Sequence, residues 1–371
     1  MHLYIHIPFC ARRCSYCDFA IAVRRDVPAR DFVDAVAREL EIRDLRGATL
    51  DTLYFGGGTP SKLGGAGIAR LVEVVRARFP IAQGAEVTIE ANPEDISSGA
   101  AVSWRDAGVN RVSLGAQSFD PAVLQWMHRT HTAAETRDAV QMLRDNGIEN
   151  ISTDLIFALP ESLSRDWDRD IEETLALEPQ HVSVYGLTVE RATPLGRWTA
   201  RGDVQEAPEE RWATEFMHAH ERLSAAGFVH YEVSNYARDG RRAKHNSAYW
   251  RDRPYIGLGP SAHGYDGVTR RWNESAYAHW LARVAGGEDP VAGSEVLTDE
   301  QRYAERAYTG LRTDAGFVIE PATHSVVIPW VEQGWAATSE TGGQIVLKLT
   351  PSGWMRLDAL VSALTSLTSR Y

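Results

Sequence analysis

The first half of the chain alternates short apolar runs with longer segments in which apolar residues recur every three or four positions. The short runs are rich in β-branched and aromatic residues, as buried parallel strands tend to be. Six strands are predicted, at residues 3–7, 52–55, 86–91, 111–115, 151–157 and 181–186. Helical periodicity fills the gaps: Phe32, Val36 and Leu40 share one helix face, and Gly147 follows a helical segment as a C-cap does.

Six strand–helix repeats within residues 1–190 predict parallel β/α units. A closed eight-unit barrel typically needs about 250 residues. The expected fold class is therefore α/β, with a partial (β/α)6 TIM-like barrel and a small C-terminal α+β or helical domain. The predicted parts are a barrel core over 1–235, an extension and linker over 236–290, and the C-terminal domain over 291–371. Residues 231–272, dense in Gly, His, Tyr and Trp, are expected to be irregular.

Charge and hydropathy argue against two classes of protein, those that bind nucleic acid and those that span a membrane. The chain has 39 basic and 50 acidic side chains and a net charge of −11, which argues against non-specific binding to nucleic acid. Arg241, Arg242 and Lys244 form a small basic cluster. No apolar run approaches the roughly 20 residues of a membrane span, and residues 1–7 are too few for a signal peptide. We expect a cytoplasmic protein that has no transmembrane segment and binds no nucleic acid.

All three cysteines lie in one loop after the first predicted strand. His6-Ile7-Pro8-Phe9-Cys10 leaves the strand and Cys14-Ser15-Tyr16-Cys17 follows, so the spacing is C-x3-C-x2-C. An odd number of cysteines so close together does not resemble a secreted disulfide framework. Three thiolates in one loop can instead ligate three irons of a cubane [4Fe–4S] cluster and leave the fourth iron open to a small molecule.

The cysteine loop has two alternatives to a cluster. Structural zinc takes four protein ligands, and His6 could complete a Cys3His set. The three thiols could also be unrelated buried side chains. Spacing alone does not separate a zinc site or buried thiols from a cluster.

The cysteine spacing, with a tyrosine before the third cysteine, resembles the signature of radical S-adenosylmethionine (SAM) enzymes. The resemblance implies that Cys10, Cys14 and Cys17 hold a [4Fe–4S] cluster. It also implies that the methionyl amine and carboxylate of SAM chelate the fourth iron, and that one-electron reduction cleaves SAM to a 5′-deoxyadenosyl radical. Such chemistry belongs to the cofactor, and the protein supplies position and electrostatics.

Residues near the ends of the later strands fit the same family. The run of three glycines before Thr59 resembles the family's GGGTP element, which binds the methionyl ammonium. A carboxylate at Glu90 can accept hydrogen bonds from ribose hydroxyls, and the Arg129 guanidinium suits the cofactor carboxylate. The resemblance places around SAM the residues Tyr4, Tyr16, Gly56, Gly57, Gly58, Thr59, Glu90, Gln117, Arg129 and Asp154. Taken singly, each of them is more often a turn glycine or a structural hydrogen-bonding residue.

Further motifs resemble the coproporphyrinogen III dehydrogenase-like branch of the family, at residues 6–10, 56–61, 115–120, 154–160, 231–237 and 257–264. In the oxygen-independent dehydrogenase itself, which oxidatively decarboxylates coproporphyrinogen III, a fourth cysteine follows the third with one residue between. Phe19 occupies that position here, and only seven residues precede Pro8. Both departures favour the heme chaperone subfamily, and the dehydrogenase is the alternative.

The segment His245-Asn246-Ser247-Ala248-Tyr249-Trp250 resembles the H-N-x-x-Y-W heme-binding motif of those chaperones. Imidazole is a common heme ligand and aromatic rings can pack on a porphyrin. The resemblance implies heme binding by His245, Asn246, Tyr249 and Trp250 and delivery to a client heme protein, including transient association with membrane-bound clients. His263, in a glycine-rich loop, is a rival iron ligand. A histidine beside aromatic residues is otherwise most often structural.

Overall fold

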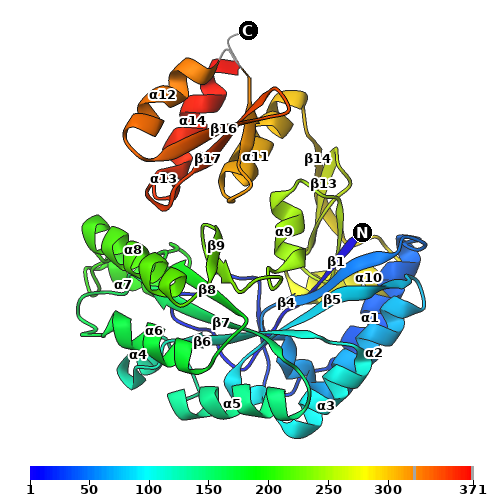
Figure 1. The fold of residues 1–371 in the computed structure, drawn as a ribbon. Coiled ribbons are helices and arrows are strands. Elements are labelled where there is room, and N and C mark those ends of the chain that lie inside the picture. The colour runs from blue at the N-terminus through cyan, green and yellow to red at the C-terminus, as the bar shows by residue number, and fades with distance from the viewer. Residues whose placement is uncertain (321–322, 369–371) are drawn as a thin grey trace.

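Six parallel strands run through the centre of the molecule in chain order (Figure 1). The computed structural model describes residues 1–320 and 323–368, so 321–322 and 369–371 of the predicted C-terminal domain lie outside the described residues. The strands are β1 (His2–Ile7), β4 (Leu50–Gly57), β5 (Ile81–Ala91), β6 (Arg111–Gln117), β7 (Asn150–Phe157) and β8 (His181–Gly186). All six predicted strands are confirmed, and most are longer than predicted.

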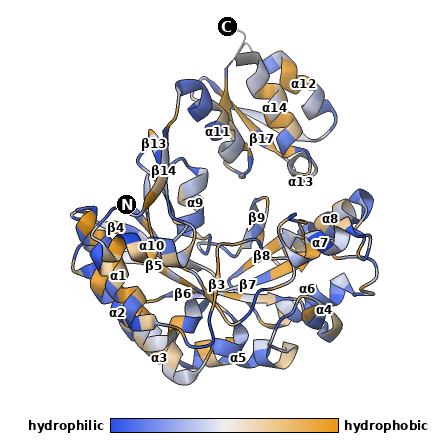
Figure 2. Ribbon diagram, turned by 180° about the vertical axis from the view of Figure 1, so that it is seen from behind, coloured by the Kyte–Doolittle hydropathy of each residue, from blue (hydrophilic) through white to orange (hydrophobic). Residues whose placement is uncertain are grey.

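Helices follow the strands and cover the outer face of the curved sheet (Figure 1). They are α1 (Ala29–Ile42), α2 (Gly64–Arg76), α3 (Ser98–Ala107), α4 (Pro121–Trp126), α5 (Ala133–Asp145), α6 (Trp167–Ala176), α7 (Pro194–Ala200) and α8 (Glu209–Ala225). In α1, Phe32, Val36 and Leu40 are fully buried, as their four-residue spacing predicts. Hydrophobic residues run along the central strands (Figure 2), where the covering helices exclude water from them.

Short strands extend the sheet at both edges. At one edge β11 (Tyr255–Leu258) pairs parallel with β1, and antiparallel strands follow it; at the other, β10 pairs antiparallel with β8. Besides β11, the edge strands are β9 (Val229–Glu232), β10 (Asn235–Ala237), β12 (His263–Tyr265), β13 (Thr269–Asn273) and β14 (Val291–Val296). The strand order runs from β14 to β9 without closing, so the barrel is open, as predicted.

The expectation that residues 231–272 are irregular is wrong. They contain the strands β10, β11 and β12, parts of β9 and β13, and the helix α9 (Lys244–Trp250). An open barrel exposes unpaired backbone groups at its edges, and these strands satisfy them. Strands of three to five residues are too short to show a clear alternating pattern, so they could not be predicted from the sequence.

A buried carboxylate fixes this extension to the barrel. Glu39 on α1 is fully buried and accepts hydrogen bonds from the Gly259 amide (2.9 Å) and the Trp280 indole (3.0 Å). Trp280 belongs to α10 (Tyr277–Ala285). Asn273 donates to the same carboxylate at 2.7 Å and Arg43 at 3.0 Å. One side chain therefore ties α1, the β11 edge and α10 together.

The last fifth of the chain forms a separate small antiparallel sheet with four helices. These are β15 (Phe317–Ile319), β16 (Ala336–Thr341), β17 (Gln344–Leu349), α11 (Asp299–Leu311), α12 (His324–Glu332), α13 (Pro351–Trp354) and α14 (Leu357–Thr368). Gly342 and Gly343, both with positive φ, form the two-residue turn of the β16–β17 hairpin. The strand β14, which the predicted division placed in this part, pairs instead with β13 in the main sheet.

Among the described residues, no helix combines the length and apolar character that crossing a bilayer requires.

Candidate site for an iron–sulfur cluster and SAM

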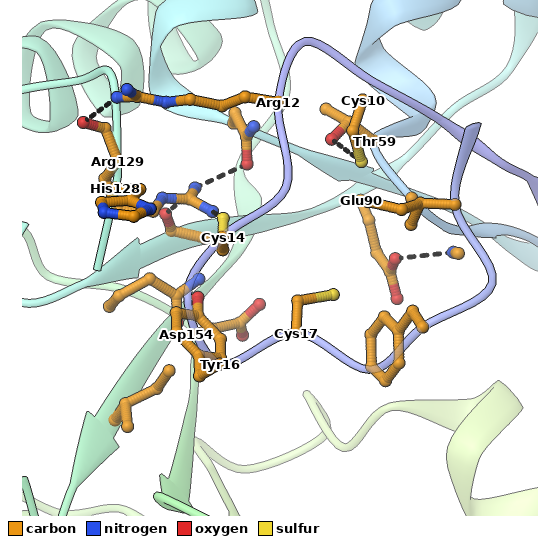
Figure 3. Close-up of a pocket in the computed structure, with 18 of the residues that line it drawn as sticks. Cys10, Arg12, Cys14, Tyr16, Cys17, Thr59, Glu90, His128, Arg129 and Asp154 are labelled. Carbon is orange, nitrogen blue, oxygen red and sulfur yellow. Dashed lines mark hydrogen bonds between the residues drawn. The ribbon is translucent and has the colours of Figure 1, made fainter. Parts of the chain in front are cut away.

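The cysteine loop lies between β1 and α1 and is held by a two-stranded parallel sheet. β2 (Phe9–Cys10) pairs with β3 (Ala22–Val23), so the loop leaves and returns at the same place. The Ala22 amide donates to the Pro8 carbonyl at 2.7 Å. All three cysteines are free thiols, and Figure 3 shows them arranged around a common space.

This space is a cavity of about 450 Å³ at the carboxyl ends of the central strands. Active sites of parallel β/α proteins lie at this end, and small-molecule pockets typically measure about 300–1,000 Å³. The predicted residues on its wall are Cys10, Cys14, Tyr16, Cys17, Gly57, Gly58, Thr59, Glu90, Gln117, Arg129 and Asp154. They come from the cysteine loop, from the strands β4 to β7 and the turns that follow them, and, for Arg129, from the segment between α4 and α5. The fold thus brings distant parts of the chain to one cavity.

Tyr4 and Gly56 do not line the cavity. The Tyr4 ring lies deeper in the barrel, where it stacks on Tyr54 at 6.0 Å. A Cβ added to Gly56 would lie 2.8 Å from the Tyr4 ring and 2.9 Å from the Tyr54 ring. At Gly58 it would lie 2.6 Å from the Pro8 carbonyl oxygen. These glycines let the end of β4 pack against aromatic rings and against the cysteine loop.

The thiols are held in an environment that suits cluster ligation. Cys10 Sγ lies 3.3 Å from Thr59 Oγ1, and burial raises the pKa of Cys10 to about 11. Burial also raises the pKa of Cys17. Arg129 donates from Nη1 to Cys14 Sγ at 3.7 Å. Buried thiols lose their protons only when a cation compensates the charge, which an iron–sulfur cluster would do.

His6 would have to give up a hydrogen bond to act as a fourth zinc ligand. Its Nδ1 lies 3.1 Å from the Tyr4 hydroxyl and its Nε2 lies 2.9 Å from the Ala20 carbonyl oxygen, so both ring nitrogens have protein partners. Within residues 1–320 and 323–368, no three His, Cys, Asp or Glu side chains are arranged to bind one metal ion together. The donor set therefore fits a cluster with three protein ligands better than a Cys3His zinc site.

Two carboxyl groups whose pKa values are raised face the cavity. Glu90 accepts hydrogen bonds from the Tyr54 hydroxyl (2.8 Å) and the Gly57 amide (3.1 Å), and burial raises its pKa to about 7. Asp154 accepts from Ser113 Oγ at 3.2 Å, and burial raises its pKa. Both carboxyl groups can therefore hydrogen-bond ligand hydroxyls or amines.

Arg129 provides the buried cation of the site. Its Nη2 donates to Asn92 Oδ1 (2.6 Å) and to the Gly115 carbonyl (3.0 Å), while its Nε is buried without a partner. Arg12 donates to the Arg129 carbonyl at 2.5 Å, which joins the cysteine loop to the arginine (Figure 3). A fixed guanidinium with an unused donor is suited to a ligand carboxylate.

Several wall residues were missed by sequence reasoning. They are Arg12, Asn92, Ser113, His128, Tyr185 and Glu190. Ser113 could have been found, because it shares its face of β6 with Gly115 and Gln117 through the two-residue period of a strand. Phe19 also lines the cavity and is 60% exposed.

The helix with the predicted heme motif lies at the opposite end of the barrel, near the starts of β1 and β4. His245 is buried, with Nδ1 2.6 Å from Thr52 Oγ1 and Nε2 2.7 Å from the Tyr249 hydroxyl. Its ring stacks on Tyr54 at 4.9 Å. The Glu86 carboxylate accepts hydrogen bonds from the Lys244 and His245 amides and so ties α9 to β5. Burial lowers the pKa of His245 to about 3, so the imidazole is neutral.

The four motif residues lie on two faces of α9. His245 and Tyr249 point into the barrel, whereas Trp250 lies under the Arg312 guanidinium (4.5 Å), which follows α11. Asn246, four residues before Trp250, shares that second face. The rival ligand His263 is exposed and stacks on Trp272 at 6.1 Å, away from the motif.

Comparisons with known proteins agree with this arrangement. The family model described as the radical SAM superfamily matches residues 4–174. A heme chaperone HemW from Synechocystis sp. is 38% identical over 322 residues, covering 84% of this chain and 78% of that protein. A heme chaperone HemW from Bacillus subtilis is 34% identical over 316 residues, covering 84% of this chain and 83% of that protein.

One solved structure shows the same fold. The coproporphyrinogen III oxidase HemN from Escherichia coli superposes with a TM-score of 0.81 over 98% of this chain and 90% of that chain, at 20% identity. This likeness concerns the fold alone. The identities of the HemW proteins are far higher, and the chain therefore belongs to the HemW family within the radical SAM superfamily.

Proposed function

We propose that the protein is a heme chaperone: it binds heme together with a [4Fe–4S] cluster and SAM, and it transfers heme to client respiratory proteins. The similarity to proteins named heme chaperone HemW, over more than four fifths of the chain, carries this proposal. The client is identified by its chemistry, as a protein that needs heme.

In this proposal Cys10, Cys14 and Cys17 hold the cluster, and Arg129, Glu90 and Asp154 position SAM. When bound, the pair supplies one-electron chemistry at an iron without a protein ligand. Arg129 would pair its free Nε with the methionyl carboxylate, since that donor is buried and unpartnered. Glu90 would hold a proton at its carboxyl near neutral pH and so donate or accept a hydrogen bond.

The α9 motif would bind heme after a local rearrangement. Both nitrogens of His245 are engaged, so iron ligation requires the 2.7 Å contact with the Tyr249 hydroxyl to open. The neutral imidazole is the form that ligates iron. Trp250, whose indole nitrogen is buried without a partner, would lie beside the porphyrin.

The alternative is oxidative decarboxylation of coproporphyrinogen III. Phe19 argues against it, because an exposed phenyl ring lies at the cavity where that enzyme has a fourth cysteine. Formation of protoporphyrinogen by the reconstituted protein with SAM and a reductant would support the enzyme instead.

A hemin titration under nitrogen tests the proposal. We expect stoichiometric binding by the reconstituted protein and at least tenfold weaker binding by His245→Ala. His279→Ala is the matched control, because His279 is an exposed histidine on α10 and its side chain has no hydrogen bond among the described residues. Thermal melting separates lost binding from lost folding in His245→Ala, and His245→Gln provides a second variant that keeps a hydrogen-bonding side chain. Absence of binding by the parent would refute the chaperone proposal.

We also propose a cytoplasmic location, with transient association with membrane-bound clients. Three free thiols in one loop support it, since a reducing compartment keeps cluster-ligating thiols free.

A further inference from the structure

A second cleft, of about 400 Å³, lies beside α9 at the end of the barrel away from the cysteines. Its walls come from α9, from the residues just before and after this helix, and from the starts of β1, β4 and β5. The residues on its walls are His2, Asp51, Thr52, Ala82, Gln83, Gly84, Ala85, Arg242, Lys244, Ser247, Ala248, Arg251 and Arg253. It shares no wall residue with the cysteine cavity.

The geometry of α9 and of the turn after it places Lys244, Arg251 and Arg253 at this cleft. Lys244, Ala248 and Arg251 are spaced by four and three residues and so lie on one face of α9. Asp252 then adopts a positive φ of 53°, and the Arg253 amide donates to the Ala248 carbonyl at 3.0 Å. This Schellman turn ends the helix and brings Arg253 to the same cleft as Arg251.

Within the part of the chain that the structure describes, no carboxylate forms an ion pair with the cleft residues Lys244, Arg251 or Arg253. The pKa of the Asp51 carboxyl is lowered by its hydrogen bond to the N-terminal amino group and, less strongly, by the nearby charge of Lys244. Among the described residues, the guanidinium groups of Arg251 and Arg253 make no hydrogen bond and no ion pair. Lys244 Nζ donates a hydrogen bond to the Gly84 carbonyl at 3.1 Å.

The other charges of the cleft are already paired. Asp51 binds the amino group of Met1 at 2.6 Å, and Arg242 forms a two-point ion pair with Asp314 (2.9 and 2.6 Å). Three unpaired positive charges in one cleft stand out on a protein whose net charge is −11. Such a cleft attracts an anionic ligand over several ångströms and holds it by charge-assisted hydrogen bonds.

A wall residue of the cleft is hydrogen-bonded directly to His245 of the predicted heme motif. Thr52, on its wall, contacts His2 Nδ1 at 2.9 Å and His245 Nδ1 at 2.6 Å. The methyl groups of Ala82, Ala85 and Ala248 give the same cleft apolar surface. Two guanidinium groups beside apolar surface match a ligand that carries two carboxylates on an apolar body better than a small inorganic anion.

We infer that this cleft binds the two propionate carboxylates of heme, with Arg251 and Arg253 as the principal partners and Lys244 as the third cation. The inference rests on the proposed heme binding and names a part of the protein that the His245 motif does not include. The propionates would enter the cleft while the porphyrin lies toward α9.

The test compares hemin with hemin dimethyl ester, whose propionates are uncharged, on the full-length reconstituted protein. The variants are Arg251→Gln/Arg253→Gln and the control Arg241→Gln, an exposed arginine of the same segment that does not line the cleft. All three side chains are exposed, and melting curves check that the variants fold. We expect the double variant to bind hemin at least tenfold more weakly, and the control to bind it as the parent does. The ester should bind the parent and the double variant equally.

The outcomes separate the inference from the function on which it rests. Equal hemin binding by the parent and the double variant would overturn the inference and leave the chaperone proposal intact. Failure of the parent to bind hemin would overturn both. Displacement of hemin from the parent by millimolar inorganic phosphate, with the ester bound as tightly as hemin, would assign the cleft to a free anion and overturn the inference.

Discussion

Burial decides what the individual side chains around the cysteine cavity can do. Cys10 and Glu90 are both shifted toward their neutral forms, whereas Arg129 keeps its charge beside Cys14. A cationic ligand such as an iron–sulfur cluster would reverse this preference for the thiols. Single-residue changes therefore give the most direct access to the chemistry of the site.

Replacing Cys14 with serine should abolish cluster assembly. We expect Cys14→Ser to retain less than a quarter of the parent's iron after anaerobic reconstitution, because two thiolates do not hold a cubane cluster as three do. Iron and zinc analysis together with visible absorbance measures this. Zinc in the parent at one equivalent, without iron or colour, would contradict the cluster assignment.

The Glu90 carboxyl should make folding stability depend on pH. Its pKa in the folded protein is about 7, against a usual value of 4.5, so the folded state keeps a proton that the unfolded chain releases between these values. Stability from this group is present at low pH and is lost as pH rises toward 7. We expect the parent to lose about 2 kcal/mol relative to Glu90→Gln between pH 5 and 7.5. Urea unfolding of the cluster-free proteins tests this, and parallel pH profiles would show that Glu90 ionises normally.

At the scale of elements, the sequence predicted the six repeated strand–helix units but not the short strands at the edges of the sheet. The six parallel strands coincide with short runs rich in apolar residues, so their positions follow from the pattern. The edge strands β10 to β13 have three to five residues each, too few to show a clear pattern, so pairing with neighbouring strands in the fold determined them. The same holds for the site: the cysteines and glycines stand in recognisable motifs, whereas Arg12 and Asn92 reach the cavity only through the fold.

The contact between α1 and the β11 edge depends on Glu39. Its removal would leave the buried Arg43 guanidinium without its ion-pair partner and the Trp280 indole nitrogen without its acceptor, while Arg43 and Asn273 would keep hydrogen bonds to backbone carbonyls. We expect Glu39→Ala to lower the free energy of unfolding by about 3–5 kcal/mol. Glu41→Ala is the control, because Glu41 is exposed on the same helix and should change stability by less than about 0.5 kcal/mol. Similar melting of the two variants would show that Glu39 does not hold the extension.

At the scale of the whole molecule, the cysteine cavity and the heme motif occupy opposite ends of one barrel. The Tyr54 side chain spans the distance between them: its hydroxyl donates to Glu90 and its ring stacks on His245. The C-terminal part reaches the motif through Arg312, which lies over Trp250 and pairs with Glu232 at 3.0 Å. This arrangement places heme, in the proposed function, at a surface that a client can approach without passing the cluster.

Transfer of heme to a client tests the central claim most directly. The protein is loaded with one equivalent of hemin under nitrogen and mixed with the heme-free form of a respiratory enzyme that uses heme. Passive release is measured in parallel with an excess of an unrelated heme-binding protein as a trap. A chaperone should fill the client faster than it releases heme to the trap, and the rate should rise with client concentration. Equal rates for client and trap would show simple dissociation and contradict the chaperone function.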